Sequence, residues 1–278
     1  NMYNVAIGFG AGESVTTGIE NTLIGGLAGD AITTGDANIA LGYNSLAADT
    51  AGNGSIAIGK NALAAQNISG DVFNTAVGFA AGSATTTGVR NTLIGGLAGD
   101  SITTGLANVI IGYGCDVATG GVGNSIVIGE GVGAVGGNNF TFGNGTLDSN
   151  IAFGATSITA PSDERFKEEV ADSTAGLSFI NDLRPVTYKW KKEKDLPTTM
   201  DAYVEGSEKR VMNDNTNHGF IAQEVKAAID AHPELKDGFD MWMEKDSDGQ
   251  QRVAPSALVP MLVKAIQELT ARIETLEG

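Results

Sequence analysis

The sequence contains few of the residues that build disulfides, metal sites or membrane spans. Its 278 residues include one cysteine and two histidines. Cys115 therefore has no partner for a disulfide within the chain. His218 and His232 are too few and too isolated for a metal site, so we expect turn and surface positions for them and no metal or cofactor. No apolar run reaches the roughly 18 residues that cross a bilayer, so we expect no membrane insertion.

Basic residues are scarce in the first half of the chain. Between residues 1 and 154 the basic residues are Lys60 and Arg90, against ten acidic ones. Residues 155–278 hold 15 basic and 23 acidic residues, so each part carries a net charge of −8. A protein that follows a nucleic-acid backbone needs a basic surface. We therefore expect no nucleic-acid partner.

Glycine divides the chain into two parts. Of 39 glycines, 33 lie in residues 1–154 and six follow. We expect a repeat domain at 1–154, a connector at 155–161 and a mixed domain at 162–278. The first residues, NMYNVAIGFG, lack the charged and apolar regions of a signal peptide. They begin in the middle of a repeat, so we expect the chain to be a piece of a longer protein.

A short aliphatic run that ends in glycine recurs along the first part. The glycines lie mostly 17 residues apart, with one step of 19 and final steps of 14 and 11. The decamer NTLIGGLAGD occurs at 21–30 and again at 91–100. Self-similarity at a fixed period indicates a solenoid, here of ten coils. The repeat glycines are Gly8, Gly25, Gly42, Gly59, Gly78, Gly95, Gly112, Gly129, Gly143 and Gly154.

The letters of one coil predict a flat β-roll. In the first coil Val5 and Ile7 should point to one face of a strand and Ala6 to the other. A second short run, as in AITTG or SITTG, is expected to form a second strand. Asparagines at the start of each run should bond side chain to side chain between coils. Such a thin coil has little interior, so we expect its apolar face to be buried against other chains around a three-fold axis.

Two other interpretations of the glycine-rich segments are weak. GFGAGESVTTG at 8–18 lacks the Gly-Lys-Ser/Thr ending of a phosphate-binding loop. GGVGNSIVIG lacks the nine-residue period and the aspartates of a calcium-binding β-roll. DSDG at 246–249 is not followed by glutamate at the spacing of a calcium loop, so a turn is the better interpretation.

The repeats resemble the head domains of trimeric bacterial adhesins. GSIAIG at 54–59 and NSIVIG at 124–129 are the nearest matches to their coil motif. The resemblance covers about residues 4–154 and implies a trimeric β-roll. It is specific for the architecture and says little about a ligand.

The second part of the chain has mixed α and β patterns. VTYKW (186–190) predicts a strand, NHGFIAQEVKAAID (217–230) a strand followed by a helix, and GFDMWMEK with QQRVA a hairpin. The last segment, from 255 to 278, predicts a helix with apolar residues spaced alternately by three and four. Isoleucine at a and leucine at d mildly favour two strands, but the β-roll favours a trimer. The seam residues are Val259, Leu262, Ile266, Leu269, Ile273 and Leu276.

Four ordered motifs in this part resemble the intramolecular chaperone domain of phage tail fibres and tailspikes, peptidase family S74. They are SDERFK (162–167), LRPVTYKWKK (183–192), HGFIAQEV (218–225) and ALVPMLVKAIQEL (257–269). The resemblance implies a domain that trimerises, nucleates folding of the fibre before it, and then cuts itself off. The fold class is thus mainly β, with a C-terminal α+β domain ending in a coiled-coil-like helix.

The same resemblance implies a Ser-Lys dyad that cleaves just before its serine. Ser162 is then the nucleophile, Lys167 the general base and Pro161–Ser162 the scissile bond. Asp163 and Arg165 are expected to support the dyad, Arg165 through its positive charge, since a cationic neighbour favours a neutral lysine. A plainer alternative makes Ser162 the N-cap of a helix.

Two functions of different class follow. The first is a trimeric fibre or appendage, located in a virion, whose last domain is a folding chaperone and a single-turnover self-cleaving peptidase. The alternative is an adhesin head, on a virus or a bacterial surface, that binds a host glycan or protein. A protease acting on other proteins is weaker, because the sequence shows no His/Asp partner set.

Overall fold

The computed structural model describes residues 3–235, 239–244 and 248–278. The chain forms two compact units, Asn1–Phe166 and Lys167–Gly278. The predicted repeat domain and connector both lie within the first unit. Among the described residues, no helix is both long enough and apolar enough to cross a membrane.

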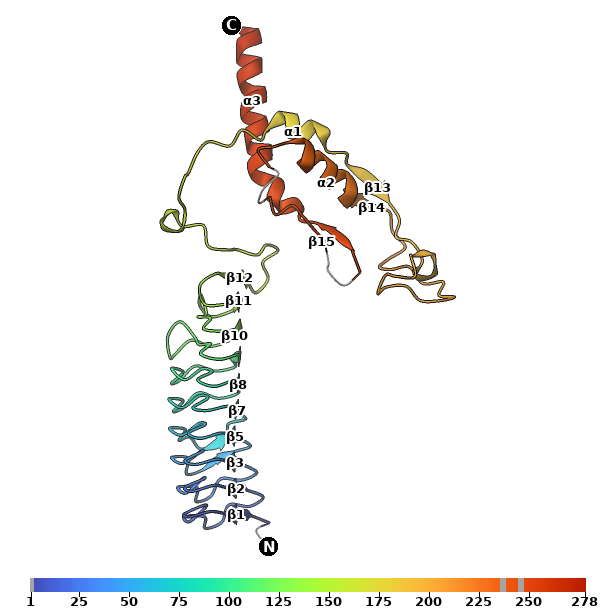
Figure 1. Ribbon diagram of the computed structural model, residues 1–278. Coiled ribbons are helices and arrows are strands. Elements are labelled where there is room, and N and C mark those ends of the chain that lie inside the picture. The colour runs from blue at the N-terminus through green and yellow to red at the C-terminus, as the bar shows by residue number, and fades with distance from the viewer. Residues whose placement is uncertain (1–2, 236–238, 245–247) are drawn as a thin grey trace. The chain divides into compact units, whose positions relative to one another are not determined.

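The first unit is a β-solenoid, as the repeat predicts. Each coil contributes one short strand, and successive strands pair in parallel along one side of the stack (Figure 1). The pairing keeps equivalent residues opposite each other, as in Leu23 beside Ala40. The parallel strands are β1 (Val5–Ile7), β2 (Thr22–Ile24), β3 (Ile39–Leu41), β5 (Ile56–Ile58), β7 (Thr75–Val77), β8 (Thr92–Ile94), β9 (Val109–Ile111), β10 (Ser125–Gly129) and β11 (Asn139–Gly143).

The two faces of these strands differ as expected. The middle residue of each three-residue strand from β2 to β9 points into the coil and is fully buried. Flanking residues point outward, and Ile39, Leu41 and Ile94 are 37–42% exposed. The outward face is therefore apolar and open in a single chain. The buried middle residues are Leu23, Ala40, Ala57, Ala76, Leu93 and Ile110.

Repeat glycines allow the coils to approach closely. Gly25 has φ +132°, and a Cβ atom there would lie 2.6 Å from the carbonyl oxygen of Gly42 in the next coil. A side chain is excluded both by the backbone conformation and by this contact.

The asparagines at the start of each repeat run form a ladder along the solenoid, in which their side chains bond mainly to backbone groups. Our expectation of bonds between side chains was mostly wrong. Asn91 Oδ1 accepts from the Asn108 amide at 3.0 Å, and Asn91 Nδ2 donates to the Gly105 carbonyl at 3.0 Å. Asn38 makes the equivalent pair of bonds with Ser55 and Gly52. Each buried amide group thus satisfies backbone groups that no strand partner reaches.

The expectation of a second strand in each coil was also mostly wrong. The amides of Thr16, Thr17 and Gly18 all point at the carbonyl of Thr33, within 3.0–3.2 Å. Three amides that converge on one oxygen form a turn, because a β-ladder alternates its donors and acceptors. In the described coils, one second pair does form, between β4 (Gly52–Asn53) and β6 (Gly70–Asp71).

A buried polar network fills the coil next to the longest repeat step. Gln66 Nε2 donates to Ser55 Oγ at 2.9 Å and to Asp49 Oδ2 at 2.5 Å, and Asn74 Nδ2 donates to Gln66 Oε1 at 2.8 Å. Ser55 stands where most coils have asparagine, so Gln66 supplies the missing amide. Burial raises the pKa of Asp49.

The solenoid ends in a hairpin, so the tenth coil that we expected does not form. β12 (Asp148–Ala152) pairs antiparallel with β11, with Phe140 opposite Ile151. The NIAFG sequence at 150–154 resembles the coil motif, but its 11-residue step is too short to circle the core. Gly145 and the Asn144 side chain, which accepts from the Leu147 amide at 3.0 Å, form the tight turn instead.

The second unit is an α+β domain around its own core. Among its described residues, the sheets are two antiparallel strand pairs, β13 with β14 and β15 with β16. Phe179 and Met241 are fully buried, with Val225, Ile229 and Leu258 packed around them. Part of the turn predicted at 246–249 lies outside the described residues. The elements are α1 (Leu177–Asp182), β13 (Val186–Tyr188), η2 (Glu193–Asp195), β14 (Asn217–Gly219), α2 (Ala222–Ala231), β15 (Trp242–Glu244), β16 (Gln251–Val253), η3 (Pro255–Leu258) and α3 (Val259–Glu277).

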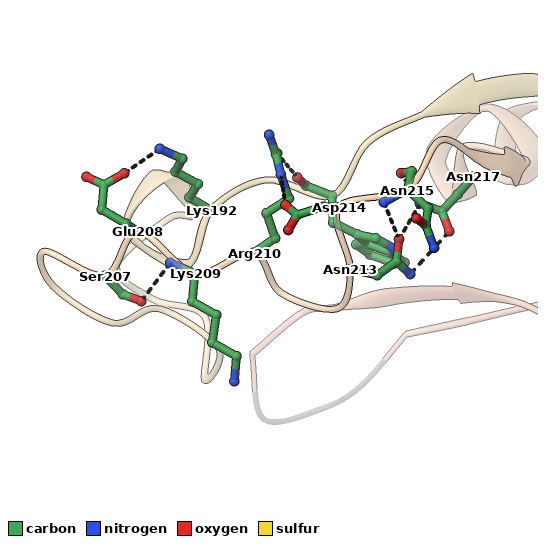
Figure 2. A network of polar contacts seen from close by, with 10 residues as sticks. Lys192, Ser207, Glu208, Lys209, Arg210, Asn213, Asp214, Asn215 and Asn217 are labelled. Carbon is green, nitrogen blue, oxygen red and sulfur yellow. Dashed lines mark hydrogen bonds and ion pairs between the residues drawn. The ribbon is translucent and has the colours of Figure 1, made fainter.

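A long loop between β13 and β14 is held by polar contacts (Figure 2). Lys192 and Lys194 both bind the carboxylate of Glu208. Arg210 Nε donates to Asp214 Oδ1 at 2.8 Å. Exposed ion pairs contribute little to stability, so this network mainly fixes the shape of the loop.

Candidate self-cleavage site and oligomerisation seam

The connector after the solenoid is exposed and anchored at one point. Asn150 and Thr159 form an antiparallel bridge, with N–O distances of 2.8 and 2.9 Å between their backbones. Every residue from 152 to 174 is exposed. The predicted scissile bond, Pro161–Ser162, therefore follows the bridge by two residues and lies in a segment that solvent reaches.

A single helical turn, η1 (Glu164–Phe166), follows the predicted nucleophile. Asp163 Oδ1 accepts a hydrogen bond from the Arg165 amide at 2.9 Å, and the Asp163 carbonyl accepts from the Phe166 amide at 3.1 Å. Asp163 thus begins and caps this turn, one residue after the cap position that the alternative interpretation gave to Ser162.

Asp163 and Arg165 also form a two-bonded ion pair. Arg165 Nε and Nη2 lie 3.0 and 2.6 Å from the two carboxylate oxygens of Asp163. The guanidinium lowers the pKa of Asp163, and the carboxylate raises the pKa of Arg165. Much of the positive charge that we expected beside Lys167 is therefore compensated. Ser162 is near the end of the first unit, and Lys167 is the first residue of the second.

The predicted heptad seam lies on the open side of α3. The side of this helix that carries Ala265 packs on the domain, and Ala265 is buried with only 4% exposed. All six seam residues are exposed, from 42% for Leu262 to 86% for Leu276. In a single chain this row of large apolar side chains has no cover. The arrangement separates the face that folds the domain from the face that is available to other helices.

His232 is buried, so the surface position that we expected for it was wrong. Its ring Nε2 lies 2.9 Å from Asp182 Oδ2, and its Nδ1 lies 3.0 Å from Glu234 Oε1. The ring edge packs on Phe179, with centroids 5.4 Å apart. Asp182 first, then Glu234, raise the pKa of His232. Asp182 and Glu234 are far apart in the sequence. A single histidine after a helix therefore gives no signal that both carboxylates contact it.

The comparison with protein families matches a segment that begins at the predicted nucleophile. The family model described as chaperone of endosialidase, peptidase family S74, matches residues 162–233. No curated protein and no solved structure matches the chain. The family match begins at Ser162, the residue that the motif analysis places directly after the scissile bond. Residues 162–233 are therefore similar to the chaperone-of-endosialidase family, and a β-solenoid of about 17-residue coils precedes them in the chain.

Proposed function

We propose that this chain is part of a trimeric fibre or appendage of a virus, whose C-terminal domain is an intramolecular chaperone. The observation that carries the proposal is the row of six exposed seam side chains on a domain of this family. A free helix with such a seam is stabilised when copies of it bury the row together. The family match supports a chaperone of the tail-fibre type.

The solenoid offers a second surface for the same assembly. Its strands present outward pairs of aliphatic residues in register, such as Ile39 and Leu41 beside Ile56 and Ile58. Contiguous apolar surface on a soluble protein marks an interaction site. Three copies that face each other across these strands would cover it, as the adhesin-like repeats imply.

Such an assembly benefits from a chaperone at one end. Each coil pairs with residues about 17 positions away, and a chain that slips by one coil still offers similar partners. Non-local β pairing is slow and exposes unpaired edges to aggregation. A C-terminal domain that trimerises first would hold three chains together and in register while the solenoid forms.

The same domain is proposed to release itself by one cut. Ser162 Oγ attacks the Pro161 carbonyl carbon while Lys167 accepts the hydroxyl proton. The C–N bond breaks, and the Ser162 nitrogen takes up a proton as it leaves. Water then hydrolyses the ester and restores the hydroxyl. Because nucleophile and scissile bond are adjacent, proximity replaces substrate binding.

Denaturing electrophoresis with N-terminal sequencing tests the cut. We expect two fragments, the smaller beginning at Ser162, and one intact band for Ser162→Ala and Lys167→Ala. Lys167→Arg should also stay intact, because a guanidinium remains protonated and cannot act as base. A small fragment that begins elsewhere, or that persists in Lys167→Ala, would show proteolysis of an exposed connector by another enzyme. An intact wild-type chain would leave the chaperone role without cleavage.

A further inference from the structure

The residue after each repeat glycine forms a column along the solenoid. The backbone carbonyl of each column residue accepts a hydrogen bond from the next coil. The donor there is the amide of the residue directly after the column position. The Asn61 amide donates to the Tyr43 carbonyl at 3.0 Å, and the Ala80 amide to the Lys60 carbonyl at 2.9 Å. The column is therefore in register, with one residue per coil. Its members are Phe9, Gly26, Tyr43, Lys60, Phe79, Gly96 and Tyr113.

Aromatic rings occupy every second position of this column. Their exposed fractions are 86% for Phe9, 53% for Tyr43, 54% for Phe79 and 62% for Tyr113. Two steps between parallel strands separate neighbouring rings, a distance of about 9.6 Å. Exposed aromatic side chains at a constant interval are unusual for a surface that only faces water.

The small residues between the rings give them room. A Cβ atom on Gly26 would lie 3.4 Å from Cδ2 of Tyr43, and one on Gly96 would lie 3.4 Å from Cδ2 of Tyr113. Both tyrosine rings therefore lean over a glycine of the coil before them. This position supports each ring from below and leaves much of it open to solvent.

The centre of the column carries a positive charge. Lys60 Nζ lies 6.0 Å from the ring centroid of Tyr43 and 6.0 Å from that of Phe79. Lys60 is one of two basic residues among residues 1–154, which otherwise carry ten acidic ones. Its placement between two exposed rings joins a cation to an aromatic surface. A ligand that is complementary to both the aromatic rings and the Lys60 ammonium has apolar faces and a negatively charged group.

We propose that this column, from Phe9 to Tyr113, binds an extended β-linked polysaccharide that contains hexuronic acid. The negative face of an aromatic ring attracts the polarised C–H groups on the face of a sugar ring. In an extended β-linked chain every second sugar presents the same face, and each sugar is about as long as one strand spacing. Tyr43 and Phe79 then stack on alternate sugars, and the Lys60 ammonium contacts the carboxylate of the sugar between them.

The charge pattern also sets where the site ends. The position after Tyr113 in the column is Glu130, which is exposed. The carboxylate of Glu130 repels the carboxylates of an acidic polysaccharide. The site therefore spans the seven positions from Phe9 to Tyr113 and takes about six sugars. This inference needs the folded solenoid and does not depend on cleavage.

Titration calorimetry on the full chain with three hexasaccharides tests the site. The probes are β-1,4-linked mannuronate, β-1,4-linked glucose and α-1,4-linked glucose. We expect the mannuronate to bind most tightly and the neutral β-linked chain more weakly. The α-linked chain, which is helical, should not bind. Equal binding of the two β-linked probes would overturn the assignment of hexuronate, and absence of binding would overturn the site.

Variants separate the column from the rest of the surface. Tyr43→Ala with Phe79→Ala should weaken mannuronate binding about tenfold, because two stacked rings are lost. Lys60→Gln should remove the difference between the acidic and neutral probes. Phe73→Ala is the matched control, because Phe73 is 57% exposed and packs over Gly54 outside the column. Equal loss in the control, or a change of oligomeric state in the double variant, would contradict the proposal.

Discussion

Glu268 in α3 caps α1, although 91 residues separate them in sequence: its Oε2 accepts a hydrogen bond from the Leu177 amide at 2.9 Å. Gly176, at the N-cap position of α1, has no side chain to do this. A Cβ atom on Gly176 would lie 2.6 Å from Glu268 Oε1, so the glycine leaves room for the contact. The helix that carries the exposed seam thus also completes the N-terminus of α1.

Loss of this cap should destabilise the second unit. For Glu268→Ala we expect a loss of about 0.5–2 kcal/mol, because the α1 amides lose a charged acceptor. Both tryptophans, Trp190 and Trp242, lie in the second unit, so their fluorescence during denaturant unfolding reports on it alone. Glu277→Ala, near the exposed end of α3, is the control. Equal stability of the two variants would show that the cap contributes nothing.

The exposed seam should be needed for folding of the solenoid. Ile266→Asn with Ile273→Asn places amides where helices from other copies would bury them, which costs free energy when the amides find no partners. We expect this variant to be monomeric, with residues 1–154 failing to reach a protease-resistant state. Gln267→Asn with Glu274→Asn, on the same turns of α3, is the control. A seam variant that still gives a protease-resistant solenoid would refute the chaperone role.

Stability of the second unit should fall as pH rises above about 6.5. Asp182 and Glu234 raise the pKa of His232 above its ordinary value of 6.5. The folded state therefore holds the proton more tightly than the unfolded state, and its advantage is complete below the unfolded pKa and lost as pH passes the folded pKa. Tryptophan fluorescence during thermal unfolding at several pH values measures this trend.

His232→Gln should remove this pH dependence and cost about 1–3 kcal/mol at low pH, because two charge-assisted hydrogen bonds are lost. His218→Gln is the matched control, since His218 is exposed in β14. A control variant that changes the profile as much as His232→Gln would assign the dependence elsewhere.

The asparagine ladder should stabilise the solenoid strongly. Asn91→Ala leaves the Asn108 amide and the Gly105 carbonyl without their buried partner, at about 1–3 kcal/mol for each unsatisfied group. Circular dichroism during denaturant unfolding of the full chain follows the loss. Thr104→Ala, at an exposed position of a coil, should change little. If the two variants unfold at the same denaturant concentration, the ladder has no such role.

The spacing of the glycines predicts most of the fold of the first unit. Each repeat glycine from Gly8 to Gly129 has a positive φ and lies against the next coil, so its position tolerates no side chain. The same rule misassigns Gly154, since the NIAFG letters match the motif while the short step forces a hairpin. Threonine runs such as Thr33–Thr34 resemble strands by composition, yet convergent hydrogen bonds make them turns. Such bonding depends on which carbonyl lies opposite, which periodicity does not reveal.

In the second unit, local patterns predict the elements but not their contacts. The three-and-four spacing identifies the seam from Val259 to Leu276, and the structure leaves it exposed. The Glu268 cap and the contact of His232 with Asp182 join residues 91 and 50 positions apart, so no local signal exists for them. The pairing of Asp163 with Arg165 is also missed, since charge spacing alone does not say which partner a guanidinium takes.

The central claim is that three chains assemble through the seam and the solenoid face. Light scattering on the purified full chain at micromolar concentration measures this directly. We predict a species of about 85 kDa if the chain is uncleaved, three times the 28.4 kDa of one chain. A mass of one chain or of two would contradict the account.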